Sequence, residues 1–120
     1  MAYREQRKSV RLNHKLPCSV GSRKELEGGV VQNFSTEGMC VHTCLAAGRG
    51  DILEIILVNR NGKKMTVRGS VARMRRNTSE DLYSYKHSVD LGLSLIKAPW
   101  EYFQLLGSLQ NKTSEGSKHG

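Results

Sequence analysis

Several features that define other protein classes are scarce in this sequence. Its 120 residues contain three cysteines, an odd number, which argues against a disulfide scaffold. The longest apolar runs, such as 55–58, are far shorter than the roughly 20 residues that a helix needs to cross a bilayer. No apolar stretch follows the charged N-terminus, so a signal peptide is not expected. These absences predict a cytoplasmic, single-domain protein without membrane insertion.

Acidic residues are also few, and no Ser/His/Asp or Cys/His arrangement stands out. We therefore expect no catalytic residues and no enzyme activity. No internal repeat or heptad pattern is present.

Positive charge is abundant and unevenly placed. The chain has a net charge of +8. Residues 1–24 hold seven Lys or Arg and one acid, and residues 60–76 hold seven Lys or Arg and none. The segment 25–59 is net acidic at −4, and 77–120 is nearly neutral at −1. Two basic segments in an otherwise mildly acidic chain suggest an anionic partner.

Short alternating apolar segments dominate residues 15–96 and indicate strands. Leu16, Cys18 and Val20 alternate with Pro17 and Ser19, which is the period of two expected in a strand. Further strands are predicted at 30–34, 39–43, 51–58, 64–74 and 83–96, with a hairpin turn at 59–62 and a polar loop at 77–82. Five or six short strands without a helix between them predict an antiparallel barrel or sandwich.

One helix is expected after the last strand. Pro99 suits its first residue, and Trp100, Phe103, Leu106 and Leu109 recur at helical spacing. We expect this apolar face to pack on the barrel. Residues after 110 carry no large apolar side chain and are expected to be disordered. The predicted organisation is a basic arm (1–14), a barrel with its closing helix (15–110) and a disordered tail (111–120).

Two short motifs contain the residue types that bind phosphorylated purines. Arg7 and Arg11 form an Arg-x-x-x-Arg motif in the basic arm. Asn33, Ser35 and Gly38 form an Asn-x-Ser-x-x-Gly motif at the end of the second predicted strand. Each motif has a plain alternative interpretation, because the arginines could be surface charge and the second motif an ordinary turn. Their order and placement together favour a ligand site.

The chemistry of these side chains fits such a ligand. A guanidinium is planar, permanently charged and offers paired donors to phosphate oxygens or to the O6/N7 edge of guanine. An Asn carbonyl oxygen accepts from the N–H groups of a base, and a Ser hydroxyl donates to phosphate or to nearby backbone. Gly38 permits a positive φ or close approach of backbone to ligand.

The two motifs, the strand-rich body and the closing helix together resemble the PilZ domain family. Residues 50–55, 69–73 and 91–93 add to the resemblance, which covers roughly residues 4–110. It implies an all-β fold, a six-stranded antiparallel PilZ-type β-barrel with a C-terminal α-helix packed against it. The family typically binds the bacterial second messenger cyclic di-GMP and is associated with motility and biofilm formation.

The resemblance also implies roles for the motif residues. Arg7 and Arg11 would hold phosphate and the Hoogsteen edge of guanine, and Asn33 would contact a guanine. Ser35 and Gly38 would complete the floor of the site. No cofactor is implied beyond the ligand itself, cyclic di-GMP.

We expect ligand binding to be relayed to an effector protein, which the sequence does not identify. With no catalytic or DNA-binding domain in the sequence, ligand binding would act through rearrangement of the N-terminal arm. One alternative is a ligand-independent, PilZ-like interaction adaptor, against which the intact motifs argue. Another is a basic barrel that binds a nucleic-acid polymer, but aromatic side chains for base stacking make up only 6% of the chain.

Two further groups of residues contain candidate metal ligands or additional positive charge. Cys40, His42 and Cys44 alternate along one predicted strand, but alternate side chains lie about 6.6 Å apart, too wide for one tetrahedral metal ion. No metal site is therefore expected. The basic residues 73, 75 and 76 could line the ligand site or the surface for an acidic partner, and the sequence leaves both possibilities open.

Overall fold

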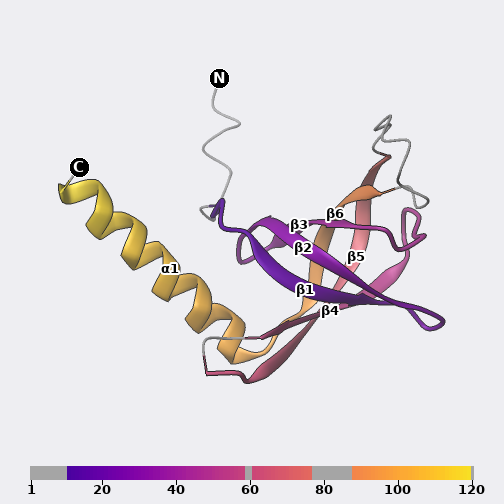
Figure 1. Cartoon of the computed structure of the whole chain (residues 1–120), viewed down its shortest axis with the longest axis horizontal. Helices are drawn as coiled ribbons and strands as arrows, with labels where there is room; N and C mark the ends of the chain where they lie inside the picture. Colours follow the sequence, from indigo (N-terminus) through magenta and orange to yellow (C-terminus); the bar gives the residue numbers. More distant parts are fainter. Residues whose placement is uncertain (1–10, 59–60, 77–87, 120) are drawn as a thin grey trace.

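Six strands and one helix make up the part of the chain that the computed structural model describes, residues 11–58, 61–76 and 88–119, with side chains up to residue 110. The elements are β1 (Leu16–Gly21), β2 (Leu26–Phe34), β3 (Gly38–Thr43), β4 (Ile52–Val58), β5 (Lys64–Arg76), β6 (Val89–Lys97) and α1 (Trp100–His119). The strands close into a barrel in the order β1-β2-β3-β6-β5-β4, and every neighbouring pair is antiparallel (Figure 1). The predicted six-stranded barrel with a C-terminal helix is confirmed.

The barrel interior is filled by alternate residues of each strand. In β4, Leu53, Ile55 and Leu57 are buried, while Glu54 between them is exposed. The same alternation continues in β3, β5 and β6, so one face of the closed sheet supplies the core. Each fully buried aliphatic side chain contributes about 1.5–3 kcal/mol relative to an exposed one. The regular alternation therefore fixes which face of each strand is inside.

The predicted hairpin turn joins β4 to β5, whose pairing begins at Val58 opposite Lys64. Gly62 has a φ of +81°, a backbone conformation that favours glycine. Residues 59 and 60 of this turn lie outside the described residues. So do the predicted loop at 77–82 and the first residues, 83–87, of the last predicted strand; β6 begins at Val89.

Helix α1 buries Leu106 and Leu109 as predicted, but it buries Tyr102 in place of Trp100 and Phe103. Tyr102, Leu106 and Leu109 are buried in the core, whereas Trp100 is 71% exposed and Phe103 is also exposed. Residues three and four positions apart share a helix face, but Trp100 lies two positions, about 200°, from Tyr102. The prediction that Trp100 packs against the barrel is therefore wrong.

Helix α1 is also longer than expected. It extends to His119, so the structure differs from the predicted disordered tail over residues 111–119 (Figure 1). Backbone hydrogen bonds can continue a helix without apolar side chains, and no proline follows Pro99 to interrupt them. Within the described part of the chain, no helix is long and apolar enough to cross a membrane.

β3 and β6 approach each other so closely at Gly38 that a side chain there is not accommodated. An added Cβ would lie 2.5 Å from the carbonyl oxygen of Leu93 on β6. We expect Gly38→Ala to lower the free energy of unfolding by about 1–3 kcal/mol, because the backbone must move to relieve this contact. Urea denaturation followed by circular dichroism measures the change.

Gly28→Ala is the matched control for this prediction. Gly28 is also a strand residue, but a Cβ added there would meet nothing within 4 Å. We expect its free energy of unfolding to change by less than about 1 kcal/mol. Equal stability of the two variants would contradict the prediction, since it would mean that β6 moves aside for a methyl group without cost.

Candidate anion-binding site

Two β-bulges turn polar side chains to the outside of the barrel. In β2, the pairing with β3 skips from Val31 to Asn33, and in β5 the pairing with β6 skips from Val71 to Arg73. Val31 and Val71 are buried, so a regular strand would direct residues 33 and 73 inward as well. The one extra residue in each strand reverses this direction. Arg73 is therefore exposed, and Asn33 lies on the outer face, half-buried.

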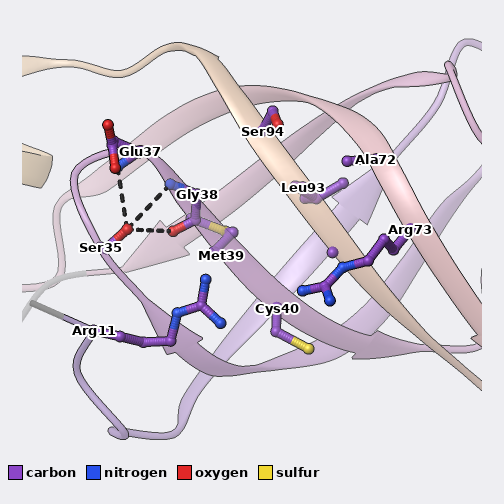
Figure 2. Close-up of a pocket in the computed structure, with 11 residues that line it drawn as sticks. Arg11, Ser35, Glu37, Gly38, Met39, Cys40, Ala72, Arg73, Leu93 and Ser94 are labelled. Carbon is purple, nitrogen blue, oxygen red and sulfur yellow. Dashed lines mark hydrogen bonds between the residues drawn. The ribbon is translucent and has the colours of Figure 1, made fainter. Parts of the chain in front are cut away.

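The redirected residues form one row across four strands. Asn33 is opposite Cys40 on β3, Cys40 is opposite Gly92 on β6, and Gly92 is opposite Arg73 on β5. Directly opposite residues of antiparallel strands present their side chains on the same face. A Cβ added at Gly92 would lie 3.4 Å from Nε of Arg73, an ordinary contact distance, so the Arg73 side chain lies directly over Gly92. In Figure 2, Arg73 extends toward Cys40.

A hydrogen-bonded turn between β2 and β3 borders this row. The Ser35 backbone N–H donates to the Gly38 carbonyl oxygen at 2.8 Å. The Ser35 Oγ accepts from the N–H groups of Glu37 and Gly38 at 3.2 and 3.3 Å (Figure 2). Ser35 is buried, and its hydroxyl is engaged within the turn. Its observed role is to shape the turn, which places the Gly38 backbone at the edge of the site.

Arg11 reaches the same place because the chain before β1 pairs with the end of β2. The Leu12 N–H donates to the Phe34 carbonyl at 2.8 Å, and the Phe34 N–H donates to the Leu12 carbonyl at 3.1 Å. Leu12 is buried, which anchors this bridge. In Figure 2, Arg11 and Arg73 point into the same space from opposite sides, with Cys40 between them.

These residues enclose a pocket of about 320 Å³ on the outer face of the barrel. Its wall combines Arg11, the turn at Ser35 and Gly38, and parts of β3, β5 and β6, including Arg73 and Cys40. The volume falls at the lower end of the range typical of small-molecule sites. Two guanidinium groups at one concave surface favour an anion with planar, paired acceptors.

The Cys40 thiol at the floor of the pocket is influenced by the charges around it. Burial raises the pKa of the Cys40 thiol and the nearby Asp90 raises it further, whereas Arg11, Arg73 and Arg75 lower it, and the net shift is upward. The thiol is therefore neutral at physiological pH and adds no negative charge that would oppose a bound anion.

A second pocket of about 660 Å³ adjoins the first on the far side of Arg73. The two share Arg73 and its neighbours in the row, and the second adds Arg49 and Arg75. Arg75 donates to Asp90 Oδ2 at 3.2 Å, and His42 Nδ1 lies 2.8 Å from Asp90 Oδ1. The cationic surface thus continues beyond the first pocket and already holds one carboxylate.

The structure brings together three of the five predicted site residues. Arg11, Ser35 and Gly38 all line the first pocket. Asn33 does not line it, and its Oδ1 is buried without a hydrogen-bond partner among the described residues. Arg7 lies outside the described residues, so its predicted role stays a prediction.

Sequence reasoning left the role of Arg73 open and did not single out Gly92. A glycine interrupting the last predicted strand was visible in the sequence, but its purpose depends on the bulge that places Arg73 opposite it. Among residues 11–58, 61–76 and 88–119, no group of three His, Cys, Asp or Glu side chains is placed to hold a metal ion.

Known proteins share the fold of this chain. The PilZ domain family matches residues 5–97. Among solved structures, the inhibitor of motility MotI/DgrA from Bacillus subtilis is similar with a TM-score of 0.69 and 17% sequence identity, over 92% of this chain and 52% of that one. This chain thus spans about half the length of the Bacillus protein.

A second similar structure is the PilZ domain of YcgR from Escherichia coli with c-di-GMP. It has a TM-score of 0.67 and 13% identity, over 94% of this chain and 98% of that one. At these identities the two structures show a shared fold. A comparison with curated proteins gave no match. Because the family match covers most of the chain, including both motifs and all six strands, the protein belongs to the PilZ domain family.

Proposed function

We propose that this protein is a receptor for cyclic di-GMP and binds it in the pocket between Arg11 and Arg73. The observation that carries the proposal is that two guanidinium groups enter one pocket from opposite sides above a neutral thiol. Each guanidinium can form paired hydrogen bonds to a phosphate or to the O6/N7 edge of guanine. Membership of the PilZ family, and the similarity to a YcgR domain solved with c-di-GMP, support this ligand.

The other motif residues take distinct roles in the proposed complex. Asn33 Oδ1 is buried without a partner among the described residues and does not line the pocket, so the proposed contact of Asn33 with a guanine requires its side chain to turn toward the pocket when the ligand binds. Ser35 holds the turn in shape, and Gly38 lets the ligand approach the backbone. Asn33 is neutral, so its contact lacks the charge assistance that a carboxylate would provide.

The N-terminal arm connects binding to output in this proposal. Arg7, four residues before Arg11, supplies a further guanidinium to the ligand, and the resulting rearrangement of the arm is what a partner protein recognises. The Leu12–Phe34 bridge supports this role of the arm, because it holds the base of the arm on the barrel beside the pocket. The name of the Bacillus relative, an inhibitor of motility, supports motility as the process controlled.

The contacts are sufficient for a useful affinity. A dissociation constant near 1 μM corresponds to about 8 kcal/mol. Hydrogen bonds to charged groups contribute roughly 1.5–3 kcal/mol each, so several arginine contacts reach this value even after part is lost in ordering the arm.

Calorimetric titration with cyclic di-GMP tests the proposal. We expect wild-type protein to bind in the micromolar range or tighter, and Arg11→Ala and Arg73→Ala each to weaken binding by about tenfold or more, since one charge-assisted contact is lost. Arg7→Ala is expected to have a similar effect. Arg68→Ala is the matched control: Arg68 is on β5 like Arg73, but pairs with Glu54 at 3.1 Å and lines a different pocket.

The control should bind within about twofold of wild type. Absence of binding to wild-type protein would overturn the proposal. Equal weakening by Arg68→Ala and Arg73→Ala would instead indicate attraction by overall charge, as expected for a nucleic-acid polymer, whose affinity falls steeply with salt.

Alkylation of cysteines locates the ligand independently of mutation. Because Cys40 lies on the pocket floor, saturating cyclic di-GMP is expected to slow its reaction with iodoacetamide by about fivefold or more at about pH 8.5. Cys44 is exposed and lines neither of the two pockets described above, so its rate should not change. Mass spectrometry of peptides reports both rates in one sample.

Cys18 provides an internal reference for this measurement. Burial raises its thiol pKa to about 11, so Cys18 should react slowly with and without ligand. If calorimetry shows binding but the Cys40 rate is unchanged, the ligand binds elsewhere on the protein.

A further inference from the structure

Helix α1 is attached to the site turn by one buried residue. The Tyr102 hydroxyl donates to the backbone carbonyl oxygen of Ser35 at 2.6 Å. Tyr102 is fully buried, and its ring packs against Phe34, with centroids 6.1 Å apart. The helix therefore contacts the site turn through a polar bond and an adjoining aromatic contact, at two consecutive residues of the barrel.

The contacts continue from Tyr102 to both sides of the pocket. Ser35, which accepts the tyrosine bond, also holds the N–H groups of Glu37 and Gly38 through its hydroxyl. Phe34, which packs on the tyrosine ring, pairs with Leu12, the residue next to Arg11. One residue of α1 thus supports the turn that borders the pocket and the bridge that holds Arg11 over it.

We propose that Tyr102 is a positioning residue of the anion pocket, and that through it the occupancy of the pocket is coupled to the attachment of α1. The hydroxyl holds the Ser35 carbonyl, and with it the turn, in the shape that the ligand requires. Without the hydroxyl, that carbonyl loses a buried hydrogen bond and the turn gains alternative conformations. The coupling to ligand rests on the proposed function, because cyclic di-GMP is the ligand used to test it.

Coupling between two sites is reciprocal. If attachment of α1 favours the ligand, then the ligand must favour attachment of α1 by the same factor. Ligand binding is therefore expected to protect backbone amides in the first turns of α1, although the pocket is lined by other elements. The attachment of α1 would then change when the pocket is occupied, as the conformation of the N-terminal arm does in the proposed function.

Tyr102→Phe tests the proposal because it removes the hydroxyl and keeps the ring that packs on Phe34. We expect faster hydrogen exchange at the amides of Glu37 and Gly38 in the absence of ligand. We expect cyclic di-GMP to bind about fivefold or more weakly by calorimetry. The protection of residues 101–106 that the ligand confers on wild-type protein should be reduced in the variant.

Leu105→Ala is the matched control for a general weakening of the helix. Leu105 lies on α1 and is partly buried against the core. Leu105→Ala is expected to lower the free energy of unfolding. Hydrogen exchange at the turn and the affinity for cyclic di-GMP should stay within about twofold of wild type. Equal effects of the two variants on the turn would overturn the proposal, because any loosening of α1 would then suffice.

The exchange and binding measurements separate this proposal from the proposed function. If wild-type protein does not bind cyclic di-GMP, the proposed function fails, and exchange at Glu37 and Gly38 alone decides whether Tyr102 positions the turn. If wild-type protein binds and Tyr102→Phe leaves exchange at these two amides unchanged, the positioning role is overturned whatever the affinity does.

Discussion

The alternation of side chains along each strand decides which residues face outward from the barrel. The candidate site depends on two β-bulges, one in β2 and one in β5, that interrupt this alternation. The interior of this six-stranded barrel is filled by apolar side chains, and the candidate site lies on its outer face. The bulges in β2 and β5 shift Asn33 and Arg73 to that outer side, where Cys40 and Gly92 complete one row between them. Regular strands would have placed residues 33 and 73 in the core, at a large cost for the charged one.

The second constraint is electrostatic, because the guanidinium groups that line the two adjoining pockets repel one another. Arg11 and Arg73 line the first pocket, and Arg73 and Arg75 line the second. Asp90 offsets part of this charge by its contact with Arg75. Backbone pairing sets where two of these side chains leave the chain: the bridge at Leu12 holds the backbone next to Arg11, and the bulge in β5 turns Arg73 to the outer face. The backbone at both arginines is therefore held by the barrel, which limits the entropy that an anion entering the pocket would cost.

Much of the fold and part of the site could be predicted from the sequence. The strands of the barrel, the hairpin at 59–62 and the closing helix follow from period-two and period-3.6 patterns, which depend on neighbouring residues alone. Arg11, Ser35 and Gly38 were predicted from motif spacing and lie at one pocket. On α1 the burial of Leu106 and Leu109 was predicted correctly, but the burial of Tyr102 rather than Trp100 could not be predicted, because both are aromatic and only the barrel surface decides between them. The position of Asn33 away from the pocket wall likewise depends on pairing with β3.

The fold class, the order of the elements and the strongly basic surface follow from the amino-acid sequence, because alternation, turn residues and charge are local properties. Which arginine faces Arg11 depends on how the strands pair, since a bulge is a difference of register between two strands and leaves no trace in either strand alone. The tertiary structure also decided that Tyr102 reaches Ser35, because that hydrogen bond joins residues 67 positions apart, whose proximity depends on barrel closure and on where α1 docks.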